Sequence, residues 1–218
     1  MKSILVIGLG RFGRHVAMKL NEMNHQVMAV DTSEERLNDA LDFVTSGQIG
    51  DATNKAFLSS LGVSDFDACI VAIGDDFQSS LETASLLKEL GARHVIARAS
   101  TGVQKKFLLR NGADQVVYPE EQLGAWTAIR CTSDHILDYV DLDGEDGDWA
   151  IFELKVPEDW WGKTVVELDI RRRHGINILG VRSGGVLDMN VTPETRLHPD
   201  ASVLVLGQEK AVHRCFRV

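Results

Sequence analysis

The residues most able to do chemistry form a glycine-rich loop near the N-terminus. Gly8, Gly10 and Gly13 are spaced as GxGxxG, with Arg11 and Phe12 between the last two glycines. In such a loop Gly8 permits a tight turn, Gly10 lets the backbone approach a pyrophosphate, and Gly13 allows close helix–strand packing. The free N–H groups and partial positive charge of the following helix then face the phosphates. The loop predicts a dinucleotide site, and a glycine turn without a ligand is the alternative.

Asp31 ends the next apolar run, at the place where a carboxylate of such a fold accepts hydrogen bonds from ribose hydroxyls. Its charge also repels a 2′-phosphate, which disfavours NADP. Because Asp31 precedes Thr32, Ser33 and an expected helix, capping of that helix is an alternative role. The two roles are compatible.

Three later strand ends contribute to the same crevice, since ligands of a doubly wound sheet bind at the carboxyl ends of its strands. The candidates are Asp51, Ala52, Thr53, Ile73, Gly74 and Arg98. Asp51 and Thr53 would meet the base and Gly74 would pass the phosphates, although βα turns favour such residues as caps in any case. Arg11 and Arg98 would reach a terminal phosphate from two sides, with a solvated arginine as the alternative for each.

Residues suited to catalysis are not grouped in this way. Seven histidines are scattered, none at metal-ligand spacing or at an expected strand end: His15, His25, His94, His135, His174, His198 and His213. There is no Walker lysine and no GxSxG motif, and a dehydrogenase would need an acid–base residue and a substrate pocket. The three cysteines, Cys69, Cys131 and Cys215, form no CxxC pair and indicate reduced thiols rather than disulfides or a zinc site. We therefore expect a binding protein rather than an enzyme.

The elements that must position these residues alternate over residues 1–118. Expected strands cover 4–7, 26–30, 43–49, 68–73, 95–97 and 115–118. Helical patterns lie between them at 12–23, 33–41, 54–61, 77–90 and 102–110. Continuous apolar strands separated by helices are typical of right-handed βαβ units in a parallel sheet that is covered on both faces. We predict an α/β fold with a Rossmann-like, doubly wound, parallel six-stranded sheet.

The rest of the chain has a different pattern. Residues 119–141 show helical periodicity. Residues 142–148 are densely acidic and predict an exposed linker, because like charges repel and stay solvated. A calcium loop is the alternative, although the spacing does not match an EF-hand. Residues 149–218 predict a small α+β domain, with Ser183, Gly184 and Gly185 as a hairpin turn.

Composition narrows the function classes. The chain has 218 residues, of which 44% are hydrophobic and 25% charged, as in soluble globular proteins. The net charge of −9 works against nucleic-acid binding. No signal peptide fits the N-terminus, and no apolar run approaches the roughly 20 residues that span a bilayer. We expect a cytoplasmic protein whose membrane role, where it has one, acts through a partner.

Together, these segments resemble the regulatory subunits of bacterial Ktr and Trk potassium transporters, which are built from RCK (also called KTN) domains. The similar segments are 6–13, 30–31, 50–53, 71–74 and 112–120 in the first part, and 162–168 and 175–181 in the second. The resemblance covers essentially the whole chain. It implies a nucleotide-binding RCK N-terminal domain over 1–118, a crossover and dimerisation helix over 119–141, and an RCK C-terminal subdomain over 149–218 after the acidic linker.

The resemblance also implies how such a chain works. It implies a cytoplasmic homo-oligomer, a dimer that assembles into an octameric ring, at the inner face of the cell membrane under a membrane-embedded potassium-translocating subunit. ATP and ADP, and in some members NAD or NADH, compete for the Rossmann cleft and change the shape of the ring. Arg11 matches the arginine that reaches the γ-phosphate, and Asp31 matches the ribose-binding acid. Glu120 matches a glutamate that in some members binds Mg²⁺ or Ca²⁺ near the nucleotide.

In some relatives the C-terminal subdomain binds cyclic di-AMP between two subunits. The residues of this chain that would serve are Arg171, Ile178, Leu179 and Pro193. Core packing and a turn proline are the alternative for them. The long acidic linker and the adjacent Trp160 and Trp161 depart from the family pattern.

Three functions follow as hypotheses. The first is a nucleotide-gated regulatory subunit of a potassium transporter, without turnover of the nucleotide. The second is an NAD-dependent oxidoreductase, which requires a catalytic histidine or lysine in the cleft. The third is an NADH-responsive regulator of DNA, against which the acidic charge and the lack of a helix-turn-helix argue.

Overall fold

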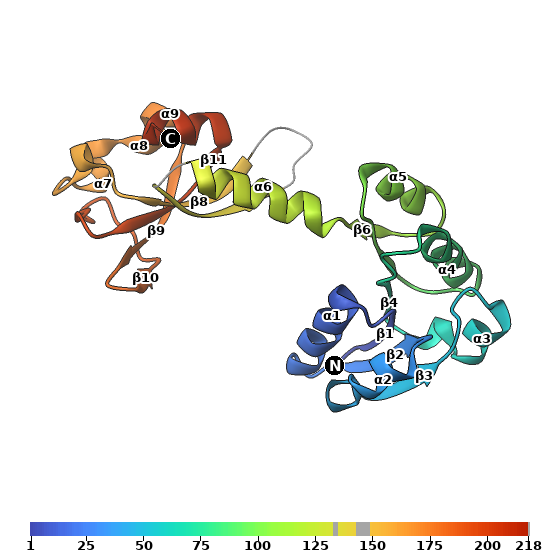
Figure 1. The fold of residues 1–218 in the computed structure, drawn as a ribbon. Helices are drawn as coiled ribbons and strands as arrows, with labels where there is room; N and C mark the ends of the chain where they lie inside the picture. Colours follow the sequence, from blue (N-terminus) through green and yellow to red (C-terminus); the bar gives the residue numbers. More distant parts are fainter. Residues whose placement is uncertain (133–134, 143–148, 218) are drawn as a thin grey trace. The chain divides into compact units, whose positions relative to one another are not determined.

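The structure is a computed structural model that describes residues 1–132, 135–142 and 149–217 (Figure 1). The chain divides into two compact units, residues 1–121 and 122–218, each with its own sheet and core. Apart from Leu142, the predicted acidic linker and its calcium-loop alternative lie outside the described residues. Within the described ranges, no helix has the length and apolarity needed to cross a membrane.

The first unit is built on a six-stranded sheet with the order β3-β2-β1-β4-β5-β6. Its strands are β1 (Ser3–Ile7), β2 (Gln26–Asp31), β3 (Ser46–Ile49), β4 (Ala68–Val71), β5 (Val95–Arg98) and β6 (Gln115–Val117). All neighbours are parallel, which confirms the predicted Rossmann-like sheet. The third strand begins at Ser46 and not at Phe43, because residues 41–43 form a 3₁₀ turn. The strand order reverses between β1 and β4, where their carboxyl ends frame a crevice.

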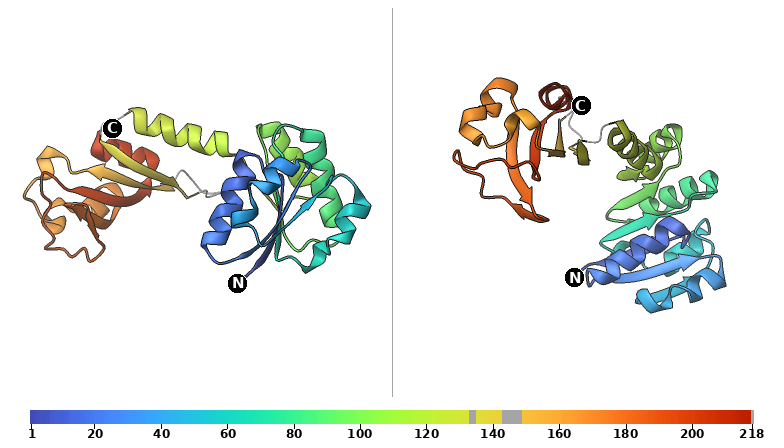
Figure 2. Two further views of the ribbon diagram at one scale, coloured as in Figure 1. Left: turned by 60° about the horizontal axis from the view of Figure 1, so that its bottom comes forward. Right: turned by 60° about the vertical axis from the view of Figure 1, so that its left-hand side comes forward.

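Helices cover both faces of this sheet (Figure 2). They are α1 (Arg11–Glu22), α2 (Glu34–Asn38), α3 (Lys55–Ser60), α4 (Phe77–Glu89) and α5 (Gly102–Arg110). Because successive strand residues point to opposite faces, β1 supplies two cores. Leu5 and Ile7 pack in the core that receives α3, α4 and α5, while Ile4 and Val6 pack against α1.

The second unit holds a five-stranded antiparallel sheet with the order β10-β9-β11-β8-β7. Its strands are β7 (Ile136–Asp141), β8 (Trp149–Lys155), β9 (Asn177–Ser183), β10 (Val186–Asp188) and β11 (Ser202–Gln208). Helices α7 (Val165–Leu168), α8 (Ile170–His174) and α9 (Glu209–Phe216) complete the unit. Gly184 and Gly185 have φ of +56° and +83°, as a two-residue type I′ hairpin turn requires. The predicted small α+β domain is confirmed.

The helix predicted over residues 119–141 is only partly correct. Helix α6 covers Pro119–Thr132, whereas residues 136–141 form β7, paired with β8. Two contacts favour the strand. Ile136 is 4% exposed in the core of the second unit, and the ring of Tyr139 lies 5.0 Å from that of Phe152. Burial against the sheet thus outweighs the helical spacing of the apolar residues in this segment.

The adjacent tryptophans have different surroundings. Trp160 belongs to the core, with its ring centroid 4.8 Å from that of Phe216. Trp161 is 43% exposed and donates its indole N–H to the carbonyl oxygen of Val156 at 3.1 Å. Both side chains therefore have structural contacts within the second unit.

Candidate functional site

The glycine loop connects β1 to α1 with a geometry that its residue types determine. Gly8 has φ of +93°, which favours glycine, and its N–H donates to the carbonyl oxygen of Val30 at 2.8 Å. A Cβ on Gly13 would overlap the carbonyl oxygen of Gly8 and lie 2.9 Å from the Cβ of Ala72. A Cβ on Gly10 would meet nothing within 4 Å. The loop therefore packs tightly under the helix at Gly13 and stays open at Gly10.

The N-terminus of α1 has no side-chain cap from the residues that the structure describes. Its N-cap residue is Gly10, and the first hydrogen bond of the helix runs from the N–H of Arg14 to the carbonyl oxygen of Gly10 at 2.9 Å. The first N–H groups of a helix have no partner inside the helix and are satisfied by caps, water or ligands. An uncapped N-terminus next to open space is suited to an anion.

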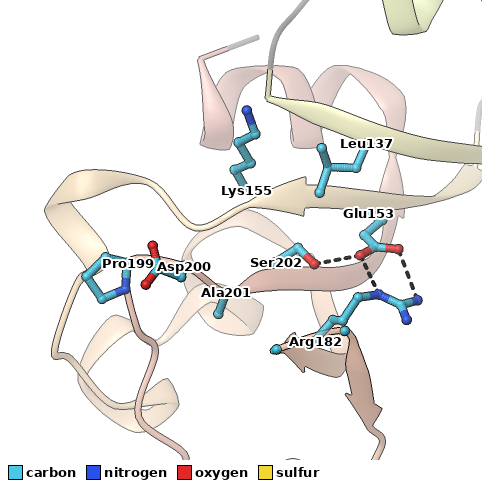
Figure 3. A pocket seen from close by; sticks show the side chains of 10 residues that line it. Leu137, Glu153, Lys155, Arg182, Pro199, Asp200, Ala201 and Ser202 are labelled. Atoms are coloured by element: carbon cyan, nitrogen blue, oxygen red, sulfur yellow. Dashed lines mark hydrogen bonds and ion pairs between the residues drawn. The ribbon is translucent and has the colours of Figure 1, made fainter.

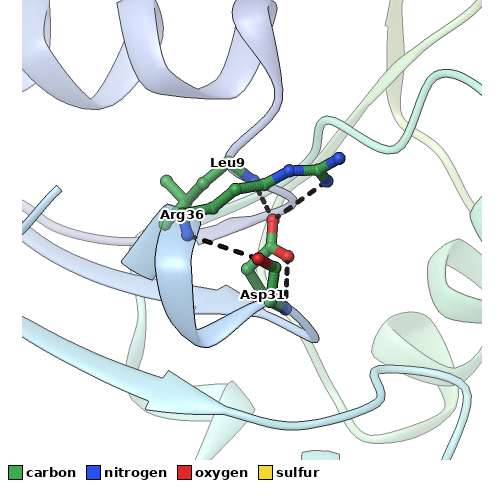
Figure 4. Close-up of polar contacts among 4 residues, drawn as sticks. Leu9, Asp31 and Arg36 are labelled. Atoms are coloured by element: carbon green, nitrogen blue, oxygen red, sulfur yellow. Dashed lines mark hydrogen bonds and ion pairs between the residues drawn. The ribbon is translucent and has the colours of Figure 1, made fainter. Parts of the chain in front are cut away.

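Asp31 joins the end of β2 to the glycine loop (Figure 4). Its side chain is 3% exposed, and its carboxylate accepts the N–H of Leu9 at 2.7 Å and the N–H of Ser33 at 2.8 Å. The guanidinium of Arg36 lies 3.8 Å from the same carboxylate. A carboxylate has about four acceptor positions, so Asp31 keeps capacity for a ribose hydroxyl. Asp31 therefore orients the loop as well as facing the crevice, and the sequence alone did not indicate the bond to Leu9.

A cavity of about 720 Å³ lies at these strand ends within the first unit. Its volume is in the range of small-molecule sites. Nine predicted site residues line it: Gly8, Gly10, Arg11, Phe12, Asp31, Ile73, Gly74, Arg98 and Glu120. The strand order of the sheet places Asp31 at one end of the cavity, the glycine loop in the middle, and Arg98 and Glu120 at the other end.

Four other predicted residues do not line this cavity. Gly13 is buried in the first turn of α1, where it serves the packing role expected of it. Ala52 is 5% exposed and belongs to the core. The Asp51 carboxylate accepts the backbone N–H of Thr53 at 2.9 Å and its hydroxyl at 2.8 Å, so both residues are engaged in their own turn.

Eight lining residues were not among the predicted ones: His15, Thr32, Arg36, Ala72, Asp75, Asp76, Ser79 and Pro119. His15 corrects the expectation that no histidine lies at the strand-end site, since it follows Arg11 by one helical turn and so faces the same side. Asp76 caps α4, and hydrogen bonds from Ser79 hold the pKa of Asp76 below its usual value. Its position one helical turn after Arg11 is the signal that would have identified His15.

Arg98 and Glu120 form the main ion pair of the cavity. Nη2 of Arg98 lies 2.6 Å from Oε1 of Glu120. Bonding to its own backbone N–H at the start of α6 and to Arg98 holds the pKa of Glu120 below its usual value. The Arg98 guanidinium also lies 5.9 Å from the Phe12 ring centroid. It fills the space beside Gly74, where a Cβ on Gly74 would overlap the guanidinium. The absence of a side chain at Gly74 therefore lets Arg98 cross the crevice.

The arrangement supports binding of an anionic ligand. Three arginines line the cavity at the N-terminus of α1, and two of them, Arg36 and Arg98, pair with the lining acids Asp31 and Glu120. The other lining acids are Asp75 and Asp76. Among the described residues, the buried Nε of Arg98 has no hydrogen-bond partner. Among the described residues, no group of three His, Cys, Asp or Glu side chains is placed to hold a metal ion. A cation at Glu120 would therefore need further oxygens, for example from a phosphate.

The second unit has a cavity of about 370 Å³ that brings together three of the four residues that the family resemblance suggested for cyclic di-AMP. Arg171, Ile178 and Pro193 line it, with Asn177 beside them. Leu179 does not line this cavity, because consecutive strand residues point to opposite faces of the sheet.

A further cavity of about 400 Å³ in the second unit contains a polar cluster on three adjacent strands (Figure 3). The Glu153 carboxylate accepts hydrogen bonds from Nε of Arg182 at 2.8 Å and from Nη2 of Arg182 at 3.3 Å. It also accepts one from the Ser202 hydroxyl at 2.5 Å. These bonds, of which those from Arg182 have the largest effect, hold the pKa of Glu153 below its usual value, although burial acts in the opposite direction. The cluster satisfies a carboxylate that is only 12% exposed.

Two family models match the chain, one over most of each unit. The family model described as the TrkA-N domain matches residues 4–119, and that described as the TrkA-C domain matches residues 150–217. The first match covers the six-stranded sheet of the first unit and the cavity residues up to Pro119. The second covers most of the smaller sheet.

The chain is also similar to curated proteins over nearly its full length. It is 33% identical to the Ktr system potassium uptake protein A of Bacillus subtilis, over 98% of this chain and 95% of that protein. It is equally similar to protein C of the same system, and 29% identical to the Ktr system potassium uptake protein A of Vibrio alginolyticus over 98% of this chain.

Solved structures share the fold. The GsuK channel matches with a TM-score of 0.72 at 24% identity, over 97% of this chain and 38% of that chain. The GsuK channel bound to NAD matches with a TM-score of 0.71 at 24% identity, over 96% of this chain. This chain spans less than half of the length of the GsuK chains, and at this identity the likeness concerns the fold alone.

Proposed function

This chain belongs to the family of proteins built from TrkA-N and TrkA-C domains, and on that premise we propose that it is a nucleotide-sensing regulatory subunit of a potassium uptake system. The observation that carries the proposal is the cavity in front of the uncapped N-terminus of α1, with Arg11 and Arg98 on its walls and Asp31 at one end. The names of the relatives supply the potassium uptake system.

The ligand that fits the cavity is an adenine nucleotide, ATP or ADP, with NAD or NADH as competitors. In this arrangement the ribose lies at Asp31, and the phosphates lie against Gly8, Gly10 and the first N–H groups of α1. Phe12, Ile73 and Gly74 form the adjacent walls. Asp51, Ala52 and Thr53 stay candidates for the base only if their turn rearranges. NAD is included because the GsuK channel, which shares the fold, has been solved with NAD bound.

The sensing step requires contacts that differ between ligands. A γ-phosphate exists in ATP and not in ADP, so a guanidinium that reaches it, that of Arg11, distinguishes the two. Mg²⁺ or Ca²⁺ at Glu120 would add a contact that also depends on the last phosphate. Nothing in this scheme consumes the nucleotide, so the proposed protein is a sensor rather than an NAD-dependent oxidoreductase.

The output is a change in the shape of an oligomer that contacts a membrane-embedded potassium-translocating subunit. We place the protein in the cytoplasm, peripheral to the inner face of the membrane, as a dimer that assembles into an octameric ring. Helix α6 carries the dimer contacts in this proposal. The cavity with Arg171, Ile178 and Pro193, together with the neighbouring Leu179, is the proposed second site, for cyclic di-AMP.

The test is calorimetric titration of the purified full-length chain with ATP, ADP and NADH, with light scattering of the same samples. Arg11→Ala should weaken ATP binding roughly tenfold or more and ADP binding less, since it removes one charge-assisted contact to the last phosphate. Arg14→Ala is the matched control, because Arg14 lies on the same helix but pairs with Asp39 and does not line the cavity. Equal losses for ATP and ADP would remove Arg11 from the sensing role. A wild-type chain that binds none of the three ligands, or stays a monomer with each, would refute the function.

A further inference from the structure

Arg98 is held in one position by its neighbours. Its side chain is 20% exposed, its guanidinium lies over the Phe12 ring, and it fills the space left free beside Gly74. Within the described part of the chain, its carboxylate partner is Glu120, at 2.6 Å. Packing therefore fixes the cation, while the half-exposed Glu120 is the member of the pair that can move away.

The pair lies at a defined place along the cavity. The order β2-β1-β4-β5 puts Asp31 at the ribose end and the glycine loop next to it, and Arg98 and Glu120 lie beyond the loop. When the first two phosphates of a ligand lie on the loop, the group attached to the second phosphate therefore lies near Arg98. In ATP this is a third phosphate. In NADH it is the second nucleoside, which carries no negative charge.

We infer that the Arg98–Glu120 ion pair is a specificity switch that a terminal phosphate opens and a dinucleotide leaves closed. This inference rests on the proposed function, because it takes the phosphates to lie against the glycine loop. A γ-phosphate near Arg98 competes with the Glu120 carboxylate for the same guanidinium and is repelled by that carboxylate. When no divalent cation is bound, Glu120 therefore reduces the affinity for ATP and spares that for NADH, and the ratio of the two affinities depends on this residue.

The test measures ATP and NADH affinities of the full-length chain in buffer that contains EDTA, so that no divalent cation contributes. Glu120→Gln should tighten ATP binding roughly tenfold, the order expected when the guanidinium no longer has to give up a charge-assisted hydrogen bond to meet the phosphate, and change NADH binding by less than about twofold. Glu121→Gln is the matched control, since Glu121 is the next acid on α6, pairs with Lys105 and does not line the cavity. It should change neither affinity.

A double-mutant cycle separates competition for Arg98 from simple repulsion. In an Arg98→Gln background, Glu120→Gln should lose most of its effect on ATP, because no guanidinium is left to release. Melting curves of all variants show that they are folded.

The inference is overturned if Glu120→Gln leaves ATP binding unchanged or weakens it, if ATP and NADH shift equally, or if the effect persists in full without Arg98. In those cases a wild-type chain that still binds nucleotides keeps the proposed function intact. If neither the wild-type chain nor Glu120→Gln binds any of the nucleotides, the proposed function fails and the switch fails with it.

Discussion

Gly10 and Gly13 provide a paired test, because the same substitution should affect binding at one and folding at the other. Gly10 has φ of −64° and ψ of −176°, which any residue adopts, and a Cβ there meets nothing within 4 Å. A Cβ at Gly13 overlaps the Gly8 carbonyl oxygen and lies 2.9 Å from the Cβ of Ala72. Gly10→Ala therefore places a methyl group in the space proposed for phosphate, whereas Gly13→Ala forces the helix away from the strand.

The two variants should differ in melting temperature and in ADP affinity. Overpacking of this kind costs about 1–3 kcal/mol, and for a unit of this size each kcal/mol lowers the melting temperature by roughly 4 °C. Gly13→Ala should therefore melt roughly 4–12 °C lower. Gly10→Ala restricts the unfolded chain without strain, which stabilises by about 0.4–1 kcal/mol, so its melting temperature should stay level or rise slightly. Loss of one charge-assisted N–H contact, about 1.5–3 kcal/mol, should weaken ADP roughly 10- to 150-fold in Gly10→Ala.

The assay combines calorimetry of unfolding with ADP titration for the wild type and both variants. The second unit contains all four tryptophans, so its fluorescence serves as the internal reference for an unperturbed unit. A Gly10→Ala variant that melts normally and binds ADP as the wild type does would show that the phosphates do not lie against the loop. A Gly13→Ala variant of unchanged stability would show that the helix and strand are less closely packed than the structure has them.

Two further predictions concern carboxylates with little exposure to solvent. Asp31→Asn should weaken ATP, ADP and NADH alike, by roughly tenfold, because it removes a charged acceptor of the ribose common to all three, and unchanged titrations would mean that the cleft is used differently. The pKa of Glu153 is depressed, so its stabilising effect is complete above the usual value near 4.5 and is lost as the pH falls through the lower folded value. Glu153→Gln should therefore destabilise the second unit by about 1–2 kcal/mol at pH 7 and by much less near pH 3. Urea unfolding followed by tryptophan fluorescence measures both values. An equal loss at the two pH values would contradict a stabilising role for the ionised Glu153 carboxylate.

Sequence reasoning succeeded where a local pattern determines the geometry. The glycine spacing determines the turn at Gly8 and the packing at Gly13, and the apolar runs determine the parallel strands. Asp31 was found because it ends a strand next to that loop. The same reasoning put Arg98 in the site, because it ends a strand of the same sheet, whereas Glu120 was implied by the family resemblance alone.

What the sequence did not reveal depends on contacts between distant residues. The bond from Leu9 to Asp31 and the pair of Arg98 with Glu120 join different strand ends, so no local pattern contains them. Residues 136–141 have apolar positions that suit a helix as well as a strand, and only the partner strand β8 decides between them. Asp51 and Thr53 have suitable side chains, but their hydrogen bonds within the turn use these side chains locally.

The cavity has one rigid end and one replaceable end, and this asymmetry suits the proposed sensor. At the proposed ribose end, Asp31 is fixed by two backbone N–H groups, so its proposed contact would be the same for every adenine nucleotide. At the far end, Glu120 is held by a side-chain ion pair and is half-exposed, so a ligand group can take its place. Glu120 lies in the first turn of α6, the helix in which the chain passes from the first unit to the second. A ligand-dependent contact at Glu120 would therefore act on the segment that connects the two domains, whereas a contact at Asp31 would not distinguish one nucleotide from another.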